Sequence, residues 1–221
     1  MNETFSRRDA LKSVGGVGLA AVFGARALNA LGDTAAAATT TTCLLTPEVT
    51  AGPYWVPESL TRRNITEGKP GLPLVIRFTV LNAKTCKPIS NADVEIWHAD
   101  ALGNYSAVNG APTRYLRGHQ KANATGKAEF LTIFPGWYPG RTPHIHMKVS
   151  VGGNVVHTGQ VFLNEKITTT VYKQAPYSSR PGRDTLNATD SIYRNGGSRS
   201  MLTLSRNGKG YLGAITMGVH R

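Results

Sequence analysis

The sequence predicts an all-β protein, specifically an antiparallel β-sandwich with long loops, and three observations predict it. Apolar and β-branched runs of strand length recur along the chain, glycine (24) and proline (12) punctuate them, and no stretch carries a helical period of useful length. Short strands separated by such turn signals are typical of sandwiches. In chain order, the predicted strands are Leu74–Leu81, Asp93–His98, Glu129–Ile133, His144–Val151, Val155–Leu163 and Gly210–Gly218.

The connections between these strands differ in character. Some connections are short and rich in glycine, proline or asparagine, as in Val151-Gly152-Gly153-Asn154, and this composition is typical of turns. The segment Lys166–Ser200 is longer, polar and weakly patterned. We expect it to form long loops that wrap the sandwich, with room for one short helix.

Residues 1–38 are expected to be an export signal, followed by one domain over residues 39–221. Ser6-Arg7-Arg8-Asp9-Ala10-Leu11-Lys12 precedes a short uncharged apolar stretch and an alanine-rich exit. This arrangement is typical of a twin-arginine signal peptide. The alternative is a membrane-anchoring helix, for which the stretch is short and interrupted by glycine. The signal predicts the twin-arginine export machinery as a partner, an extracellular or periplasmic location, and no stable membrane association after cleavage.

The charge balance belongs to the domain and not to the signal. The chain has 25 basic and 13 acidic residues, a net charge of +12. Without residues 1–38, 21 basic and 10 acidic residues remain, a net charge of +11. The basic residues are spread over the domain in runs of at most two, and no nucleic-acid motif is present, so we expect no nucleic-acid partner.

The two cysteines, Cys43 and Cys86, allow two interpretations. In an exported protein they can form one disulfide that ties the start of the domain to its body. The alternative is two unpaired thiols.

Two histidines in one predicted strand are the first candidate for chemistry. His144 and His146 are separated by one residue, so their side chains lie on the same face, about 6.6 Å apart at Cα, close enough to share one metal ion. Ile145, Met147 and Val149 then face the opposite side of the strand, where we expect the core. The alternative is a solvated pair on an outer face.

Two tyrosines add candidate ligands to this pair. Tyr138 lies in a loop constrained by proline and glycine, and Tyr105 lies in the loop after the strand Asp93–His98. Two phenols and two imidazoles suit a trivalent iron, which deprotonates phenol, better than zinc. For either tyrosine alone, the favoured interpretation is a packed loop aromatic.

The order of several motifs resembles the intradiol ring-cleavage dioxygenases, the non-haem Fe(III) family of catechol and protocatechuate dioxygenases. The match runs from about Leu45 to Leu163, and together its motifs are specific. The matching residues are Thr50-Ala51-Gly52-Pro53-Tyr54, Glu95 to Asp100, Gly103-Asn104-Tyr105, Arg117-Gly118, Gly126, Pro135 to Pro139, Arg141 to His146 and Gln160.

The resemblance implies a role for each matching position. Tyr105, Tyr138, His144 and His146 would bind a non-haem Fe(III). Tyr138 would be the ligand that substrate displaces and would act as a base, and Arg141 would be a catalytic cation beside the substrate. Arg141, Gln160 and Tyr54 would contact the substrate. The long loops of the sandwich would then be active-site loops.

The implied reaction is ring cleavage of a catechol by O2 between its two hydroxyl-bearing carbons, which gives a cis,cis-muconate. The alternative is a non-catalytic secreted β-sandwich module that binds an aromatic polymer or a polysaccharide. The chain departs from the family in lacking the long helical dimerisation segment of catechol dioxygenases and in carrying Gly140 where protocatechuate-type chains commonly carry tryptophan. The substituents on the ring and the oligomeric state therefore stay open.

Overall fold

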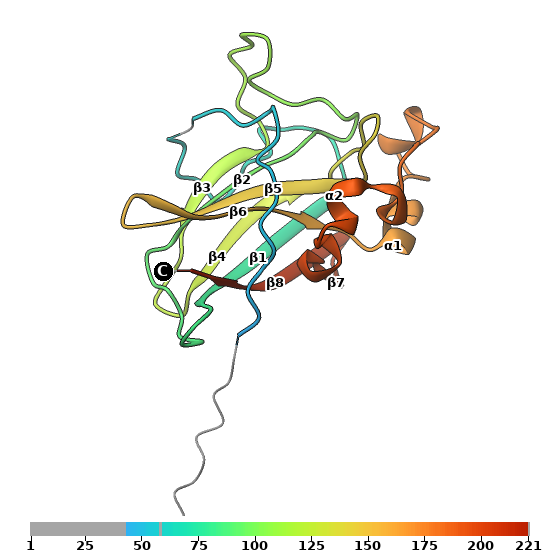
Figure 1. The fold of residues 1–221 in the computed structure, drawn as a ribbon. Coiled ribbons are helices and arrows are strands. Elements are labelled where there is room, and N and C mark those ends of the chain that lie inside the picture. The colour runs from blue at the N-terminus through green and yellow to red at the C-terminus, as the bar shows by residue number, and fades with distance from the viewer. Residues whose placement is uncertain (1–42, 58, 221) are drawn as a thin grey trace, which may run out of the picture. The chain divides into compact units, whose positions relative to one another are not determined.

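Strands dominate the structure, a computed structural model that describes residues 43–57 and 59–220, and they form two four-stranded sheets (Figure 1). One sheet has the order β4-β1-β8-β7 and the other has the order β3-β2-β5-β6. The strands are β1 Pro73–Asn82, β2 Asp93–Trp97, β3 Arg117–Lys121, β4 Lys127–Ile133, β5 His144–Val151, β6 Asn154–Phe162, β7 Thr203–Asn207 and β8 Gly210–Val219.

All six strands predicted from apolar patterning are present, and two further strands are not marked by that pattern. The strands β3 and β7 read Arg-Gly-His-Gln-Lys and Thr-Leu-Ser-Arg-Asn. Each lies at an edge of its sheet, with a single neighbour. The strand β7 is mostly exposed, so it can remain polar, whereas β3 buries Arg117 and Gly118 in place of large apolar residues. An apolar pattern therefore reveals neither strand.

The prediction of a purely antiparallel arrangement is wrong at one pair of strands. The strands β1 and β8 pair in parallel, with Leu74 opposite Tyr211 and Asn82 opposite Val219, while all other pairs of these eight strands are antiparallel. Alternation of apolar residues specifies which face of a strand is buried. It carries no information about the direction of the neighbouring strand.

The two sheets enclose one hydrophobic core. On β1, Ile76, Phe78 and Val80 are fully buried, and they alternate with half-buried residues. On β5, Ile145, Met147 and Val149 belong to the same core, as alternation predicted for this strand. The strands β2, β4, β6 and β8 contribute further core residues, among them Val94, Ile96, Phe130, Val161 and Met217.

The segment between β6 and β7 forms loops with several short helices. They are α1 Glu165–Val171, η1 Tyr177–Ser179, η2 Asn187–Thr189, α2 Ser191–Arg194 and η3 Gly197–Ser200. Figure 1 shows them together at one end of the sheets. Within the described residues, no helix is long and apolar enough to cross a membrane. The expected signal, residues 1–38, lies outside the described residues.

Cys43 and Cys86 form a disulfide across 43 residues of sequence, with their Cα atoms 5.3 Å apart. This confirms the paired interpretation over two free thiols. The bond fixes the start of the described chain to the turn that follows β1.

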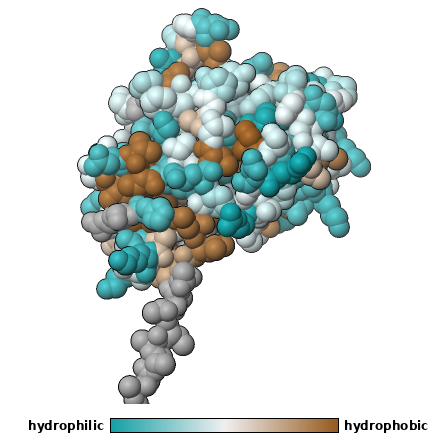
Figure 2. Space-filling model, in the orientation of Figure 1, coloured by the Kyte–Doolittle hydropathy of each residue, from teal (hydrophilic) through white to brown (hydrophobic). Residues whose placement is uncertain are grey.

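The described surface carries few large exposed apolar side chains, among them Leu44 (68% exposed) and Val155 (56%). On the face shown in Figure 2, hydrophilic residues predominate and hydrophobic residues gather toward one side.

Candidate metal centre

The strand β5 brings the two predicted histidines together. His144 and His146 lie on the face opposite Ile145 and Met147, and both imidazoles are buried. Their Nε2 atoms are 3.1 Å apart. Trp97, opposite His146 on β2, stacks on the His146 ring with centroids 5.0 Å apart and fixes its plane.

Both imidazoles are held in the neutral form. The Nδ1 atom of His144 is 2.6 Å from the carbonyl oxygen of Thr142. Because a carbonyl only accepts, Nδ1 carries the proton and Nε2 keeps its lone pair. Burial and the nearby Arg141 cation lower the pKa of His144 to about 3. Burial and His144 lower the pKa of His146 well below its usual value.

Tyr138 reaches this pair from a tight turn. Its hydroxyl lies 3.2 Å from His144 Nε2, and the turn is closed by a hydrogen bond from the Arg141 amide to the Tyr138 carbonyl. Gly140 adopts φ +79° within the turn, a conformation that favours glycine. Burial raises the pKa of Tyr138, although Arg141 acts in the opposite direction.

Tyr105 approaches from the loop after β2. The Asp100 carboxylate accepts hydrogen bonds from the amides of Leu102 and Asn104, which shapes this loop. Arg117 on β3 donates to the hydroxyl and the carbonyl of Ser106, beside Tyr105. The Tyr105 hydroxyl is buried without a hydrogen-bond partner among the described residues, and burial next to Tyr138 raises its pKa well above the usual value.

These four side chains form a donor set that could hold a metal ion. Two phenol oxygens and two neutral imidazole nitrogens meet in the protein interior, and one of the phenols lacks a partner. A trivalent ion that deprotonates phenols fits this set, because each donor becomes a ligand. No group of three or more histidine, cysteine or acidic side chains suited to a metal occurs in the described part of the chain, so the tyrosines are what completes the set.

The other predicted site residues lie around this centre. Arg141 Nη1 lies 3.4 Å from the Tyr138 hydroxyl, and its Nη2 donates to Gln160 Oε1 at 2.5 Å. Gln160 is opposite His146 on β6. Tyr54 stacks on Tyr105 with ring centroids 4.3 Å apart. All seven candidate residues are thus brought together.

Sequence reasoning missed Asp190, which holds Arg141 in place. Asp190 is fully buried, and its Oδ2 accepts from Arg141 Nε at 2.8 Å and from the Thr142 amide at 2.9 Å. Its Oδ1 caps α2 by accepting from the amides of Ile192 and Tyr193. Burial alone would raise the pKa of Asp190, but these hydrogen bonds and Arg141 lower it. The signal in the sequence was an aspartate before a short helical segment, which is typical of a cap.

A segment of residues 48–55, here called the strap, lies over the centre. The Thr50 carbonyl accepts from Gln160 Nε2 at 3.0 Å. A Cβ at Gly52, which adopts φ +70°, would lie 3.1 Å from His146 Cε1. With Tyr54 stacked on Tyr105, the strap contacts three of the candidate residues.

The far end of the strap is fixed to the sheet by Trp55. The Trp55 Nε1–H donates to both carboxylate oxygens of Glu95, at 3.0 and 3.2 Å. Lys148, opposite Glu95 on β5, places its ammonium 3.3 Å from the centroid of the Trp55 ring. Burial raises the pKa of Glu95, although the Trp55 hydrogen bond and nearby cations oppose it.

His98, at the end of the predicted strand Asp93–His98, does not belong to this donor set. Its Nδ1 donates to the Ala99 carbonyl at 2.8 Å, and its Nε2 pairs with the Thr132 hydroxyl at 2.7 Å. Both ring nitrogens are therefore used in packing. Burial lowers the pKa of His98 to about 4, so the ring is neutral.

The sequence and the fold of this chain are similar to those of known proteins. A family model described as "Dioxygenase" matches residues 51–154. Catechol 1,2-dioxygenase 2 of Acinetobacter lwoffii is 34% identical over 131 residues, which is 49% of this chain and 47% of that protein. The chain thus spans about half the length of this curated relative.

Solved structures define the family more closely. An intradiol ring-cleavage dioxygenase of Tetranychus urticae superimposes with a TM-score of 0.78 at 34% identity, over 80% of this chain and 95% of the other. The dioxygenase domain of a dioxygenase carbohydrate-binding protein fusion from Streptomyces sp. SirexAA-E superimposes with a TM-score of 0.63 at 30% identity, over 80% of this chain and 98% of that domain. The chain belongs to the intradiol ring-cleavage dioxygenase family.

Proposed function

We propose that this protein is an Fe(III)-dependent intradiol dioxygenase that uses O2 to cleave a catechol-type ring between its hydroxyl-bearing carbons. The observation that carries the proposal is the convergence of Tyr105, Tyr138, His144 and His146 with neutral imidazoles and one unpartnered buried phenol. A non-catalytic binding module has no need for such a donor set.

In this proposal Tyr105, Tyr138, His144 and His146 hold the ferric ion. Fe(III) would supply a Lewis acid that activates the catechol ring. The tyrosines would hold it as phenolates. The histidines would hold it through Nε2, and the Thr142 carbonyl keeps the proton of His144 on Nδ1.

Tyr138 acts as the base on the substrate. As a phenolate, its Oη takes a proton from a catechol hydroxyl and becomes a neutral phenol. Its turn places Oη beside Arg141 Nη1, which stabilises the phenolate before transfer. The ring bond between the hydroxyl-bearing carbons breaks, and the two atoms of O2 enter the two new carboxyl groups of a cis,cis-muconate.

Arg141 binds the substrate and stabilises negative charge that develops on the ring. Its guanidinium is fixed by Asp190 on one side and Gln160 on the other, so it needs no reorganisation during the reaction. Gln160 orients it and contacts substrate. Tyr54, on the strap, borders the entrance and excludes water from Tyr105.

Spectroscopy of the iron-loaded protein tests this assignment. We expect a red protein, from tyrosinate-to-iron charge transfer, and a change in that absorption when catechol is added anaerobically. Parallel titrations with protocatechuate and hydroxyquinol report which ring substituents are accepted. A protein that stays colourless and iron-free after iron-replete expression would refute the assignment.

We also propose that the two sheets and their shared core are the expected β-sandwich, and that residues 39–221 form this domain. Residues 1–38 would be a signal that directs the protein to the twin-arginine export route. The Cys43–Cys86 disulfide supports an oxidising destination. Replacing Arg7 and Arg8 by lysine should retain the protein in the cytoplasm. Unchanged secretion of that variant would exclude this route.

A further inference from the structure

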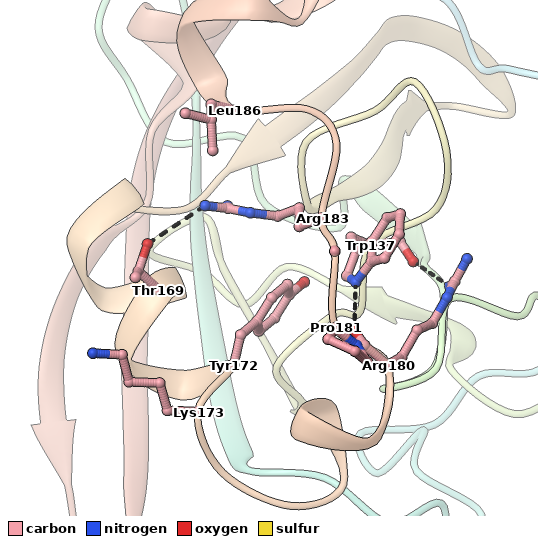
Figure 3. Close-up of a pocket in the computed structure, with 9 residues that line it drawn as sticks. Trp137, Thr169, Tyr172, Lys173, Arg180, Pro181, Arg183 and Leu186 are labelled. Carbon is pink, nitrogen blue, oxygen red and sulfur yellow. Dashed lines mark hydrogen bonds between the residues drawn. The ribbon is translucent and has the colours of Figure 1, made fainter.

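A pocket separate from the tyrosine–histidine centre lies beside Trp137 (Figure 3). It has a volume of about 380 Å³, within the range of about 300 to 1,000 Å³ that small-ligand sites occupy. Thr169 on α1, together with Tyr172 and Lys173 just after it, lines one side, and the loop with Arg180 and Arg183 lines the other. None of the seven candidate residues of the centre lines it.

Two aromatic rings supply the apolar walls of this pocket. The Trp137 indole is held in place because its Nε1–H donates to the Arg180 carbonyl at 3.2 Å. The Tyr172 hydroxyl donates to the Pro135 carbonyl at 2.9 Å, which fixes the phenol ring. Figure 3 shows both rings beside the same space. The Arg180 guanidinium lies 4.3 Å from the Trp137 ring centroid, and Tyr177 stacks on Tyr172. A flat aromatic ligand would therefore pack on the part of each ring that these contacts leave open.

The charged residues that line the pocket are basic. Arg180 is already occupied, since its Nη1 donates to the carbonyls of Leu102 and Trp137. Lys173 is exposed and forms no ion pair with any residue in the described ranges. Lys173 thus leaves the pocket with a positive charge that an anionic ligand would neutralise.

Arg183 adds a donor that the protein does not satisfy. Its Nη2 pairs with Glu165 and contacts Thr169 Oγ1, but its Nη1 is buried without a hydrogen-bond partner. Its guanidinium lies 5.6 Å from the Tyr172 ring centroid. A buried donor without an acceptor is unfavourable, so an acceptor that reaches Nη1 through a small shift of this side chain would gain a partner.

We propose that this pocket is a second binding site, which takes a flat aromatic carboxylate. The ring would lie against Trp137 and Tyr172, and the carboxylate would accept from Arg183 and Lys173. The site adjoins the centre through the chain, because Trp137 precedes Tyr138 and the pocket loop continues to Asp184, which accepts from the Gly140 amide at 3.2 Å. The proposal does not depend on the metal.

Binding is tested on the metal-free protein, so that its outcome is independent of the proposed catalysis. Benzoate is titrated while the indole N–H of Trp137 and the amides of Lys173 and Gly182 are followed by NMR. We expect saturable shifts with a Kd in the millimolar range or tighter. Cyclohexanecarboxylate, which has the charge without the flat ring, and benzyl alcohol, which has the ring without the charge, should bind more weakly.

The variant Lys173→Gln should weaken benzoate binding about five-fold, because an exposed charge contributes up to about 1 kcal/mol. Lys209→Gln, in the turn between β7 and β8, is the matched control and should change nothing. Shifts at His144 and Tyr138 with none at Trp137, equal binding of cyclohexanecarboxylate, or full affinity in Lys173→Gln would each overturn the proposal.

Discussion

At the residue scale, the decisive property of the centre is that its donors are buried and uncharged before a metal arrives. His144 and His146 have lowered pKa values, and Tyr105 and Tyr138 have raised ones, in each case chiefly through burial. The Tyr105 hydroxyl has no partner among the described residues, and the other donor atoms contact only one another and Arg141. A metal ion would satisfy them together, and loss of the Tyr105 hydroxyl should therefore have opposite effects on the metal-free and loaded protein.

The variant Tyr105→Phe tests whether Tyr105 is a metal ligand or only a packing residue. The change removes a buried hydroxyl that has no partner, so we expect the metal-free protein to keep its stability or gain about 1 kcal/mol. Iron retention should fall sharply. Chemical denaturation and iron analysis of the same preparation measure both.

Tyr177→Phe is the matched control, because its hydroxyl donates to the Phe134 carbonyl and accepts from the Leu72 amide. It should destabilise the metal-free protein by about 1–2 kcal/mol and leave iron retention intact. A Tyr105→Phe protein that retains iron normally would show that Tyr105 is a packing residue.

Asp190→Asn tests the support beneath Arg141. The variant keeps the volume but removes the negative charge of a buried ion pair, which should cost about 3 kcal/mol of unfolding free energy at neutral pH. The folded pKa of Asp190 lies below its usual 3.8, so the stability it supplies is present above that value and is lost as pH falls through the lower, folded pKa.

The difference in unfolding free energy between wild type and Asp190→Asn should therefore be largest at neutral pH and shrink in acid. Denaturant titrations across the acid range measure it. A difference that stays constant with pH would mean that the Asp190 charge does not stabilise the fold.

At the scale of elements, the centre is assembled by one strand, two loops and the strap. The strand β5 supplies both histidines, while the loops after β2 and before β5 supply Tyr105 and Tyr138. The strap covers them and is held at one end by Gln160 and at the other by Glu95. The Val49 amide and the Glu48 carboxylate also bond to Thr158. The hydrogen bond from Trp55 to Glu95 therefore fixes the far end of the strap in particular.

Trp55→Phe should loosen the strap without altering the centre itself. The phenyl ring keeps a surface for Lys148, but the hydrogen bond to Glu95 is lost. We expect roughly tenfold faster loss of iron to a chelator, and similarly faster amide exchange over the strap in the metal-free protein.

Arg206→Gln is the control for this variant. It removes a contact outside the strap, that of the Arg206 guanidinium with the Tyr211 ring, 4.6 Å from the ring centroid, on β7 and β8, and it keeps the hydrogen bond from Trp55 to Glu95. It should leave strap exchange and iron loss unchanged. Equal protection of the strap amides from exchange in wild type and Trp55→Phe would show that Trp55 does not hold the strap in place.

At the scale of the whole molecule, the disulfide joins the start of the described chain to the body of the fold. Replacing both Cys43 and Cys86 by serine should lower the unfolding free energy by about 4 kcal/mol, because the bond closes a loop of 43 residues. Reductant should lower wild-type stability by the same amount and have no effect on the variant. Equal stability of the two proteins under oxidising conditions would contradict this.

Sequence patterning was sufficient for the six strands that line the core and for the two histidines and two tyrosines of the centre, whereas Arg141, Gln160 and Tyr54 were expected only from the resemblance to the family. Alternation placed His144 and His146 on one face, and the constrained turn placed Tyr138 near them. Patterning did not reveal the polar edge strands β3 and β7, or the parallel pairing of β1 with β8. Asp190 was missed because its contact with Arg141 spans 49 residues, and no local pattern records such a partner.

One measurement tests the central claim most directly: mass spectrometry of the product formed from catechol by the iron-loaded protein under 18O2. The account predicts cis,cis-muconate that carries one labelled oxygen in each carboxyl group. Cleavage beside the two hydroxyl-bearing carbons, a product without label from O2, or no product from any catechol tested would contradict it.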